Sequence, residues 1–405
     1  MFKKALLLGL SLLLISFQAH ALTELVIWHA YRGEEKSAFE KVVKNFNDQS
    51  RATGIKVKTL AVPYDAYADK ITAAVPRGKG PDMFIFAQDR LGGWVEGGRT
   101  VESIDFFLED ETREQFVPNM IEAMTYRGTV YGLPLNYKSI TMIYNKALLK
   151  TPPTTSAELV KVGKKLTDSK VGKYGLAYSY NDFYYHAALM NAFGGRVFEP
   201  GPTPVMDAPE NVAAIDLMMK WFQEDGILPA EPSTALITSL FNEGRSAIVF
   251  SGPWFLGEVS ADIDYGLAPL PTIDEAGGKP MRPWLTIEGV YISVNSNHKE
   301  AAYTFAKYLV SEEAGLILAL EGGQLHTNKS IYKNKEVANN PVLKAFRAQL
   351  ETAIPMPNFA EMTLMWSPAT TAMNKIIKGS ASAKAALSTA QRQMEKDIAA
   401  LRKGR

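Results

Sequence analysis

The sequence predicts an α/β protein built as two lobes, each a mainly parallel sheet flanked by helices. Its 405 residues exceed the usual size of one domain and give each of two domains enough chain to bury a core. Short apolar runs alternate with segments of helical periodicity in two separate regions. Because parallel strands are covered on both faces and need helical connections, this alternation indicates parallel sheets.

The first region of alternation lies near the N-terminus. We expect strands at residues 25–28, 54–57 and 83–87, where apolar residues cluster. In residues 34–48 and 67–75, apolar positions recur every three to four residues, which predicts helices between the strands.

The second region shows the same alternation. Asp207 and Pro209 indicate the start of a helix, since proline suits the first helical turn. Further elements are expected in the order helix, strand and strand, at residues 233–242, 247–250 and 291–294, followed by helices from residue 299 onward.

Residues 1–21 have the pattern of a secretory signal peptide. Lys3 and Lys4 precede an apolar run at residues 5–17, and small residues suggest cleavage after Ala21. The run is shorter than the roughly 20 apolar residues of a membrane span. We therefore expect a protein secreted to the periplasm, without a lipid anchor because no cysteine follows the apolar run.

Composition excludes several classes of function. The chain has no cysteine, so disulfide scaffolds, thiolate metal sites and cysteine nucleophiles are excluded. The 44 basic and 43 acidic residues nearly cancel, which gives no indication of nucleic acid as a partner. Phosphate-binding, zinc-protease and nucleophile-elbow motifs are missing from the sequence. We expect no cofactor, no metal and no catalytic residue, in a monomer.

Aromatic residues lie beside hydrogen-bonding groups in several expected loops. Examples are residues 86–90, 182–185, 252–254 and 361–366. A pyranose offers an apolar C–H face for stacking on a ring and an edge of hydroxyls for charged hydrogen-bonding groups. The combination favours a sugar ligand, although each ring taken alone is more often part of a core.

A resemblance adds to this interpretation. Leu25-Val26-Ile27-Trp28, Gly80-Pro81-Asp82-Met83, Asp89-Arg90-Leu91-Gly92-Gly93 and Gly252-Pro253-Trp254 follow one another in the order of the maltose/maltodextrin branch of the periplasmic solute-binding family. The chain thus resembles receptors that serve ABC sugar importers. This implies the periplasmic-binding-protein fold, with a ligand cleft between two lobes that close about a hinge.

The resemblance also implies lobe limits and a partner. We expect one lobe at residues 22–136 plus 290–338 and the other at 137–289 plus 339–405. The implied ligand is an oligosaccharide of the maltose or maltodextrin type, which the protein would deliver to an inner-membrane ABC permease.

Ten ligand-binding residues are implied by position. Seven fit the family pattern: a basic residue after the first strand, an acidic–basic pair, three stacking rings and a carboxylate that is one methylene shorter than the usual glutamate. These are Arg32, Asp89 with Arg90, Tyr184, Trp254 and Trp366, and Asp182.

The other three residues depart from the family pattern. Tyr31 replaces an acidic residue, Phe86 a tryptophan and Lys138 a glutamate. Lys138 reverses a charge, so it is expected either to pair with Asp182 or to select a different or acidic sugar.

Three alternatives follow from the same residues. The first is a receptor for an anionic or phosphorylated sugar, with Lys138 in the cleft. The second is a secreted polysaccharide-acting enzyme that would use Asp89 and Asp182 as its carboxylate pair. The third is an Fe(III) receptor using the phenols of Tyr184 and Tyr185.

Overall fold

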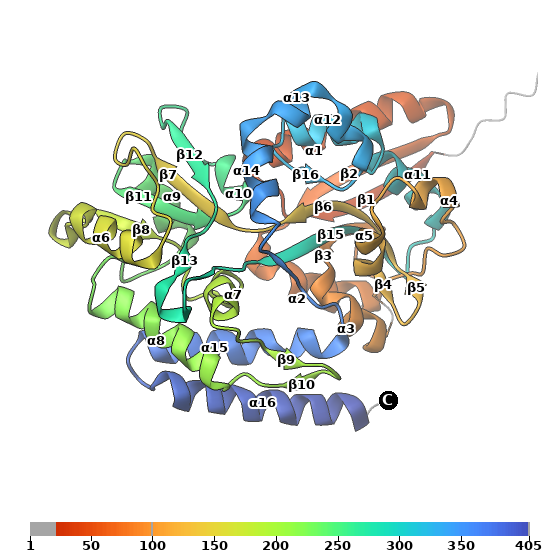
Figure 1. Cartoon of the computed structure of the whole chain (residues 1–405). Coiled ribbons are helices and arrows are strands. Elements are labelled where there is room, and N and C mark those ends of the chain that lie inside the picture. The colour runs from red at the N-terminus through yellow and green to blue at the C-terminus, as the bar shows by residue number, and fades with distance from the viewer. Residues whose placement is uncertain (1–21, 99, 404–405) are drawn as a thin grey trace, which may run out of the picture.

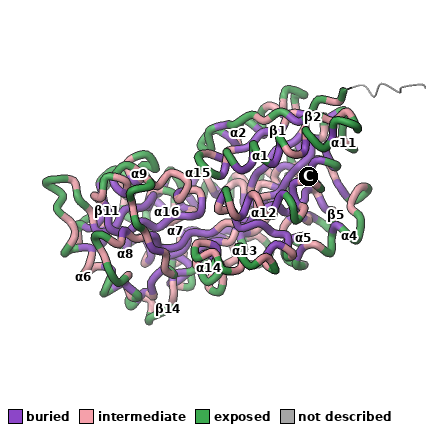
Figure 2. Tube along the Cα trace, turned by 90° about the horizontal axis from the view of Figure 1, so that it is seen from above, coloured by how far each residue is buried: buried purple, intermediate pink, exposed green. Residues whose placement is uncertain are grey.

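Two mixed β-sheets, each covered by helices, form the two lobes of the molecule (Figure 1). The structure, a computed structural model, describes residues 22–98 and 100–403, so the expected signal peptide at residues 1–21 lies outside the described residues. Seen from above, the lobes follow one another along the long axis, with buried segments inside each (Figure 2). Within the described ranges, no helix has the length and apolarity needed to cross a membrane.

The first sheet has seven strands in the order β16-β6-β15-β3-β1-β2, with β17 paired to β15. The three expected N-terminal strands are confirmed, and they form a parallel group in which β1 lies between β2 and β3. The bounds are β1 (Thr23–His29), β2 (Ile55–Ala61), β3 (Met83–Ala87), β6 (Gly132–Lys138), β15 (Trp284–Ile292), β16 (Leu325–His326) and β17 (Ile354–Pro355).

The second sheet has four strands in the order β12-β7-β11-β8, with bounds β7 (Thr141–Asn145), β8 (Tyr174–Ala177), β11 (Ser246–Ser251) and β12 (Tyr265–Ala268). Ile248 and Phe250 of β11 enter one apolar core, whereas Val249 enters another core on the opposite face. Burial on both faces explains why residues 247–250 of this strand are all apolar.

The sheets are mixed, which corrects the expectation of mainly parallel ones. β15 runs antiparallel to both β3 and β6, and β7 runs antiparallel to both β11 and β12. Residues 291–294 were expected as a short strand, but residues 291 and 292 end the long strand β15 instead. Apolar content alone does not encode strand direction, so the sequence pattern could not separate the two arrangements.

Helices cover both sheets. Around the first sheet lie α1 (Gly33–Gln49), α2 (Tyr64–Ala74), α3 (Leu91–Glu96), α4 (Asp110–Arg113), α5 (Pro118–Ala123), α11 (Lys299–Leu309), α12 (Glu312–Leu320) and α13 (Lys335–Asn339). Around the second lie α6 (Ser156–Leu166), α7 (Phe183–Ala192), α8 (Pro209–Gln223), α9 (Thr234–Asn242), α10 (Pro253–Leu256), α15 (Trp366–Ile377) and α16 (Ala383–Lys403). α14 (Pro341–Gln349) contacts β7 and β12 while its apolar side chains join the first core. Short ribbons are formed by β4 (Thr125–Tyr126) with β5 (Thr129–Val130), β9 (Phe198–Glu199) with β10 (Thr203–Pro204), and β13 (Thr272–Ile273) with β14 (Lys279–Pro280).

The chain passes between the sheets more than once. β6 of the first sheet ends at Lys138, and β7 of the second begins at Thr141. β15 returns in the other direction, since Trp284 packs in the second core and Val290 in the first. Each lobe is therefore assembled from separate stretches of chain, while the lobe limits given above stay a prediction.

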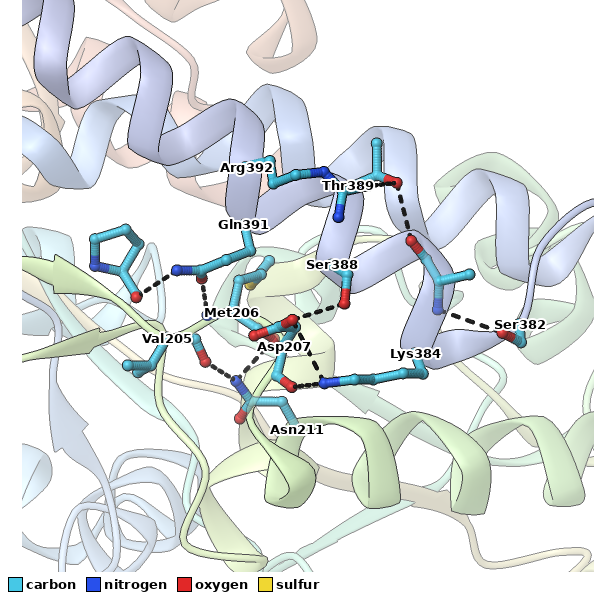
Figure 3. Close-up of polar contacts among 12 residues, drawn as sticks. Val205, Met206, Asp207, Asn211, Ser382, Lys384, Ser388, Thr389, Gln391 and Arg392 are labelled. Carbon is cyan, nitrogen blue, oxygen red and sulfur yellow. Dashed lines mark hydrogen bonds and ion pairs between the residues drawn. The ribbon is translucent and has the colours of Figure 1, made fainter.

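The C-terminal helix α16 is fixed to the second lobe by polar contacts (Figure 3). Asp207 accepts hydrogen bonds from Ser388 Oγ at 2.6 Å and from Lys384 Nζ at 3.4 Å. Gln391 donates to the carbonyl of Pro204 and accepts from the amide of Met206, both at 2.7 Å. Helix α8 begins at Pro209, as Asp207 and Pro209 indicated, and the Asp207 carboxylate contacts α16.

Candidate functional site

Aromatic side chains form a cluster where α7 and α10 begin. The rings of Tyr184 and Tyr185 lie 6.1 and 6.4 Å from that of Trp254, whose Nε1 donates a 3.2 Å hydrogen bond to Tyr185 Oη. Gly252 makes room for this geometry, because a β-carbon there would lie 2.1 Å from the indole. The Gly-Pro-Trp motif thus folds the indole back toward α7.

Two further tryptophans extend this cluster. Trp284, at the start of β15, lies 6.4 Å from Tyr184 and 5.9 Å from Trp366, measured between ring centroids. Sequence reasoning missed Trp284 because it precedes an apolar strand and is typical of a core residue there. A preceding proline, the feature it shares with Trp254, was the available signal.

Asp89, Arg90 and Trp366 form one polar group. Trp366 Nε1 donates to Asp89 Oδ2 at 2.9 Å, and Arg90 Nε lies 3.2 Å from the same oxygen. The guanidinium of Arg90 also lies over the Trp366 ring, 5.5 Å from its centroid. Burial raises the pKa of Asp89, although Arg90 and the indole N–H oppose the shift. Residues predicted from two separate motifs therefore meet.

Lys138 is held by two carboxylates. Its Nζ lies 3.1 Å from Glu35 Oε1 and 3.2 Å from Glu288 Oε1, and none of the three side chains is more than 15% exposed. Burial alone would lower the pKa of Lys138, but Glu288 and Glu35 outweigh it and the pKa is raised. The expected pairing with Asp182 is thus wrong, because Glu35 and Glu288 occupy Lys138 Nζ.

Tyr31 and Arg32 also have protein partners. Tyr31 is buried, and its hydroxyl donates to Glu288 Oε2 and accepts from Asn136 Nδ2, both at 3.1 Å. Arg32 Nε forms a 2.9 Å ion pair with Glu258, which follows α10 in the other lobe. Tyr31 therefore holds the Glu288 carboxylate by a hydrogen bond, and Arg32 forms an ion pair between the two lobes.

Phe86 is buried at 5% exposure and packs edge-on against Tyr67 and Trp94. A third ring, that of Tyr64, is parallel to it within 5° at a centroid distance of 6.0 Å. The predicted stacking residue is thus covered by Tyr64, a residue that sequence reasoning did not select.

Asp182 lies at the start of α7, where its carboxylate accepts a 2.9 Å hydrogen bond from the Tyr184 amide. Desolvation, reinforced by the carboxylate of Asp65 on α2, raises its pKa to about 6. Asp65, whose charge contributes to this shift, belongs to α2 of the first lobe.

Other polar groups have ordinary structural roles. His29, His186 and His326 are buried, and desolvation lowers the pKa of each to about 4, so all three are neutral at pH 7. Burial raises the pKa of both cluster tyrosines, to about 12 for Tyr185. In the part of the chain that the structure describes, no group of three or more histidine or acidic side chains is placed to hold a metal.

Comparison with known proteins gives a consistent result. Residues 30–316 match the family of bacterial extracellular solute-binding proteins. A maltotriose-binding protein of Pyrococcus abyssi is 33% identical over 88% of this chain and 78% of its own, and a galactooligosaccharide-binding protein of Bacillus subtilis is 26% identical over 95% and 91%. The solved maltose/maltodextrin-binding domain of Bdellovibrio bacteriovorus, bound to maltotriose, superposes with a TM-score of 0.87 at 26% identity, covering 93% of this chain and 100% of that one.

Proposed function

Because the chain belongs to the family of bacterial extracellular solute-binding proteins, we propose that it is the receptor of an ABC sugar importer and that its ligand is a neutral oligosaccharide of the maltodextrin type. Members of this family are receptors and not enzymes, so the interpretation of Asp89 and Asp182 as a hydrolytic pair is wrong.

The observation that carries the proposal is the cluster of rings formed by Tyr184, Trp254, Trp284 and Trp366 beside the carboxylate of Asp89. Trp284 is buried in the second core, whereas the partly buried rings of Tyr184, Trp254 and Trp366 suit pyranose faces, and the carboxylate suits hydroxyls at their edge. Of the ten predicted residues, Asp89, Arg90, Asp182, Tyr184, Trp254 and Trp366 are proposed to touch the sugar.

The charge around Lys138 favours a neutral ligand over an anionic one. Glu35 and Glu288 both contact the ammonium group, so two carboxyl groups surround the one lysine. A phosphorylated or acidic sugar would meet a compensated lysine and an excess of carboxylate, which repels it. The alternative based on a free Lys138 therefore has no support in this geometry.

The remaining parts of the proposal concern place and partner. A periplasmic location follows from the signal pattern of residues 1–21, and delivery to an inner-membrane permease follows from the role of the family. Closure of the lobes requires only that the sugar bind the closed form more tightly than the open form.

Calorimetric titration of the refolded, signal-free protein with maltotriose tests the function. Refolding removes any sugar retained from expression. We expect a saturable isotherm with one site, weaker binding of a galactooligosaccharide and no binding of a sugar phosphate. Heat from the sugar phosphate alone would overturn the proposed ligand class, and heat from the galactooligosaccharide alone would overturn the maltodextrin assignment.

Affinity should depend on pH through Asp182. The ionised carboxylate accepts hydroxyl hydrogen bonds more strongly than the protonated acid. Since the pKa of Asp182 is about 6, maltotriose affinity should be constant above pH 7 and fall toward pH 5, by at most about tenfold per unit.

Titrations between pH 5 and 8 measure this effect. Asp182→Asn should bind more weakly at pH 8 and lose most of the slope, whereas Asp264→Asn, at an exposed ion pair, should keep the wild-type profile. A flat wild-type profile would show that the Asp182 carboxylate does not contact the ligand.

A further inference from the structure

Tyr64 is an exposed ring on an otherwise packed part of the first lobe. It is the first residue of α2, directly after Pro63, and is 64% exposed. Tyr67, one turn later on the same helix, is fully buried against Phe86. The helix thus keeps one tyrosine in the core and leaves the other at the surface.

One face of the Tyr64 ring is fixed. It lies parallel to Phe86 within 5° at a centroid distance of 6.0 Å, and Phe86 is itself held edge-on by Tyr67 and Trp94. A ring supported from behind by a buried ring loses little freedom when a ligand stacks on its front. The exposure of Tyr64 leaves that front available.

The surroundings of Tyr64 belong to the candidate site. Phe86, on which its ring stacks, lies three residues before Asp89, whose Oδ2 accepts a hydrogen bond from Trp366 Nε1. Desolvation and the charges of Asp89 and Asp182 raise the pKa of Tyr64, with Tyr184 also contributing, which agrees with this placement. Asp182 and Tyr184 lie at the start of α7 in the other lobe.

We infer that Tyr64 is a sugar-stacking residue of the first lobe, which presents its front face to a pyranose opposite Tyr184 while Phe86 supports it from behind. The inference rests on the proposed function and extends it. Phe86, which was predicted to stack on the sugar, is buried. We therefore assign the stacking to Tyr64, whose ring lies parallel to that of Phe86. The first lobe then contributes an aromatic face to a site whose other rings come from α7, α10, β15 and α15.

Replacement of Tyr64 tests the inference by calorimetry. Tyr64→Ala should weaken maltotriose binding about tenfold, the scale of one lost aromatic contact, and Tyr64→Phe should remain within about threefold of wild type. Phe106→Ala is the matched control, since Phe106 is a 91% exposed ring on the segment before α4, and it should bind as wild type.

A second readout separates stacking from structure. The thermal midpoint of ligand-free Tyr64→Ala should match that of wild type, because the ring is mostly exposed, while the loss of affinity persists. Wild-type affinity in Tyr64→Ala for maltose, maltotriose and maltotetraose alike would overturn the inference and leave the proposed function intact. Failure of the wild-type protein to bind any of these sugars would overturn the proposed function and the inference with it.

Discussion

Replacing Lys138 with methionine should lower the free energy of unfolding by about 3–5 kcal/mol, the cost of leaving buried charge unpaired. Glu35 and Glu288 would lose their shared cation while remaining buried side by side. Burial already raises the pKa of Glu35 against the effect of Lys138, so the variant should take up a proton there. Urea unfolding at pH 7, followed by tryptophan fluorescence, measures the change.

Two variants control this result. Lys146→Met removes an exposed ion pair with Asp264 and should cost no more than about 1 kcal/mol. Adding Glu35→Gln to Lys138→Met removes one of the stranded charges and should restore part of the loss. A cost below 1 kcal/mol for Lys138→Met would mean that solvent, and not the ammonium group, compensates the two carboxylates.

Trp366→Ala should weaken maltotriose binding by about 1–3 kcal/mol. The variant loses both a stacking face and the indole N–H that donates a hydrogen bond to Asp89. Trp366→Phe keeps a ring and loses only the donor, so its affinity should lie between those of wild type and Trp366→Ala. Trp254→Ala should fall in the same range as Trp366→Ala. Calorimetric titration of each variant gives these differences directly.

The control for Trp366 is a tryptophan outside the ring contacts described above. Trp221 is fully buried in the second core, so Trp221→Phe should lower stability and leave affinity unchanged. If Trp366→Ala also lowers stability without changing affinity, its ring is part of the core and the predicted stacking is wrong.

Local elements of the fold were predictable because their causes are local. Residues 83–87 form β3 as expected, and Ser233 caps α9 through its hydroxyl, at the position where the pattern began. The antiparallel course of β15 was not predictable, since strand direction depends on connections elsewhere in the chain.

The candidate site was predictable by residue type more than by role. Tyr184 contacts Trp254, and Trp366 is hydrogen-bonded to Asp89. The ring of Trp284 contacts both Tyr184 and Trp366 and so links the two pairs. The partners of Lys138 could not be predicted, because Glu35 is 103 positions away and nothing local marks it. The exposure of Tyr64 and burial of Phe86 are likewise tertiary properties, decided by which ring covers the other.

The course of β15 bears on when the chain can fold. This strand lies at the centre of the first sheet, between β3 and β6, and its first residue, Trp284, also packs in the second core. The second core further includes Ile398, close to the end of the chain. Neither core is complete until most of the polypeptide has emerged, and such long-range pairing is slow. The order of the strands thus delays completion of both cores until most of the chain has been synthesised.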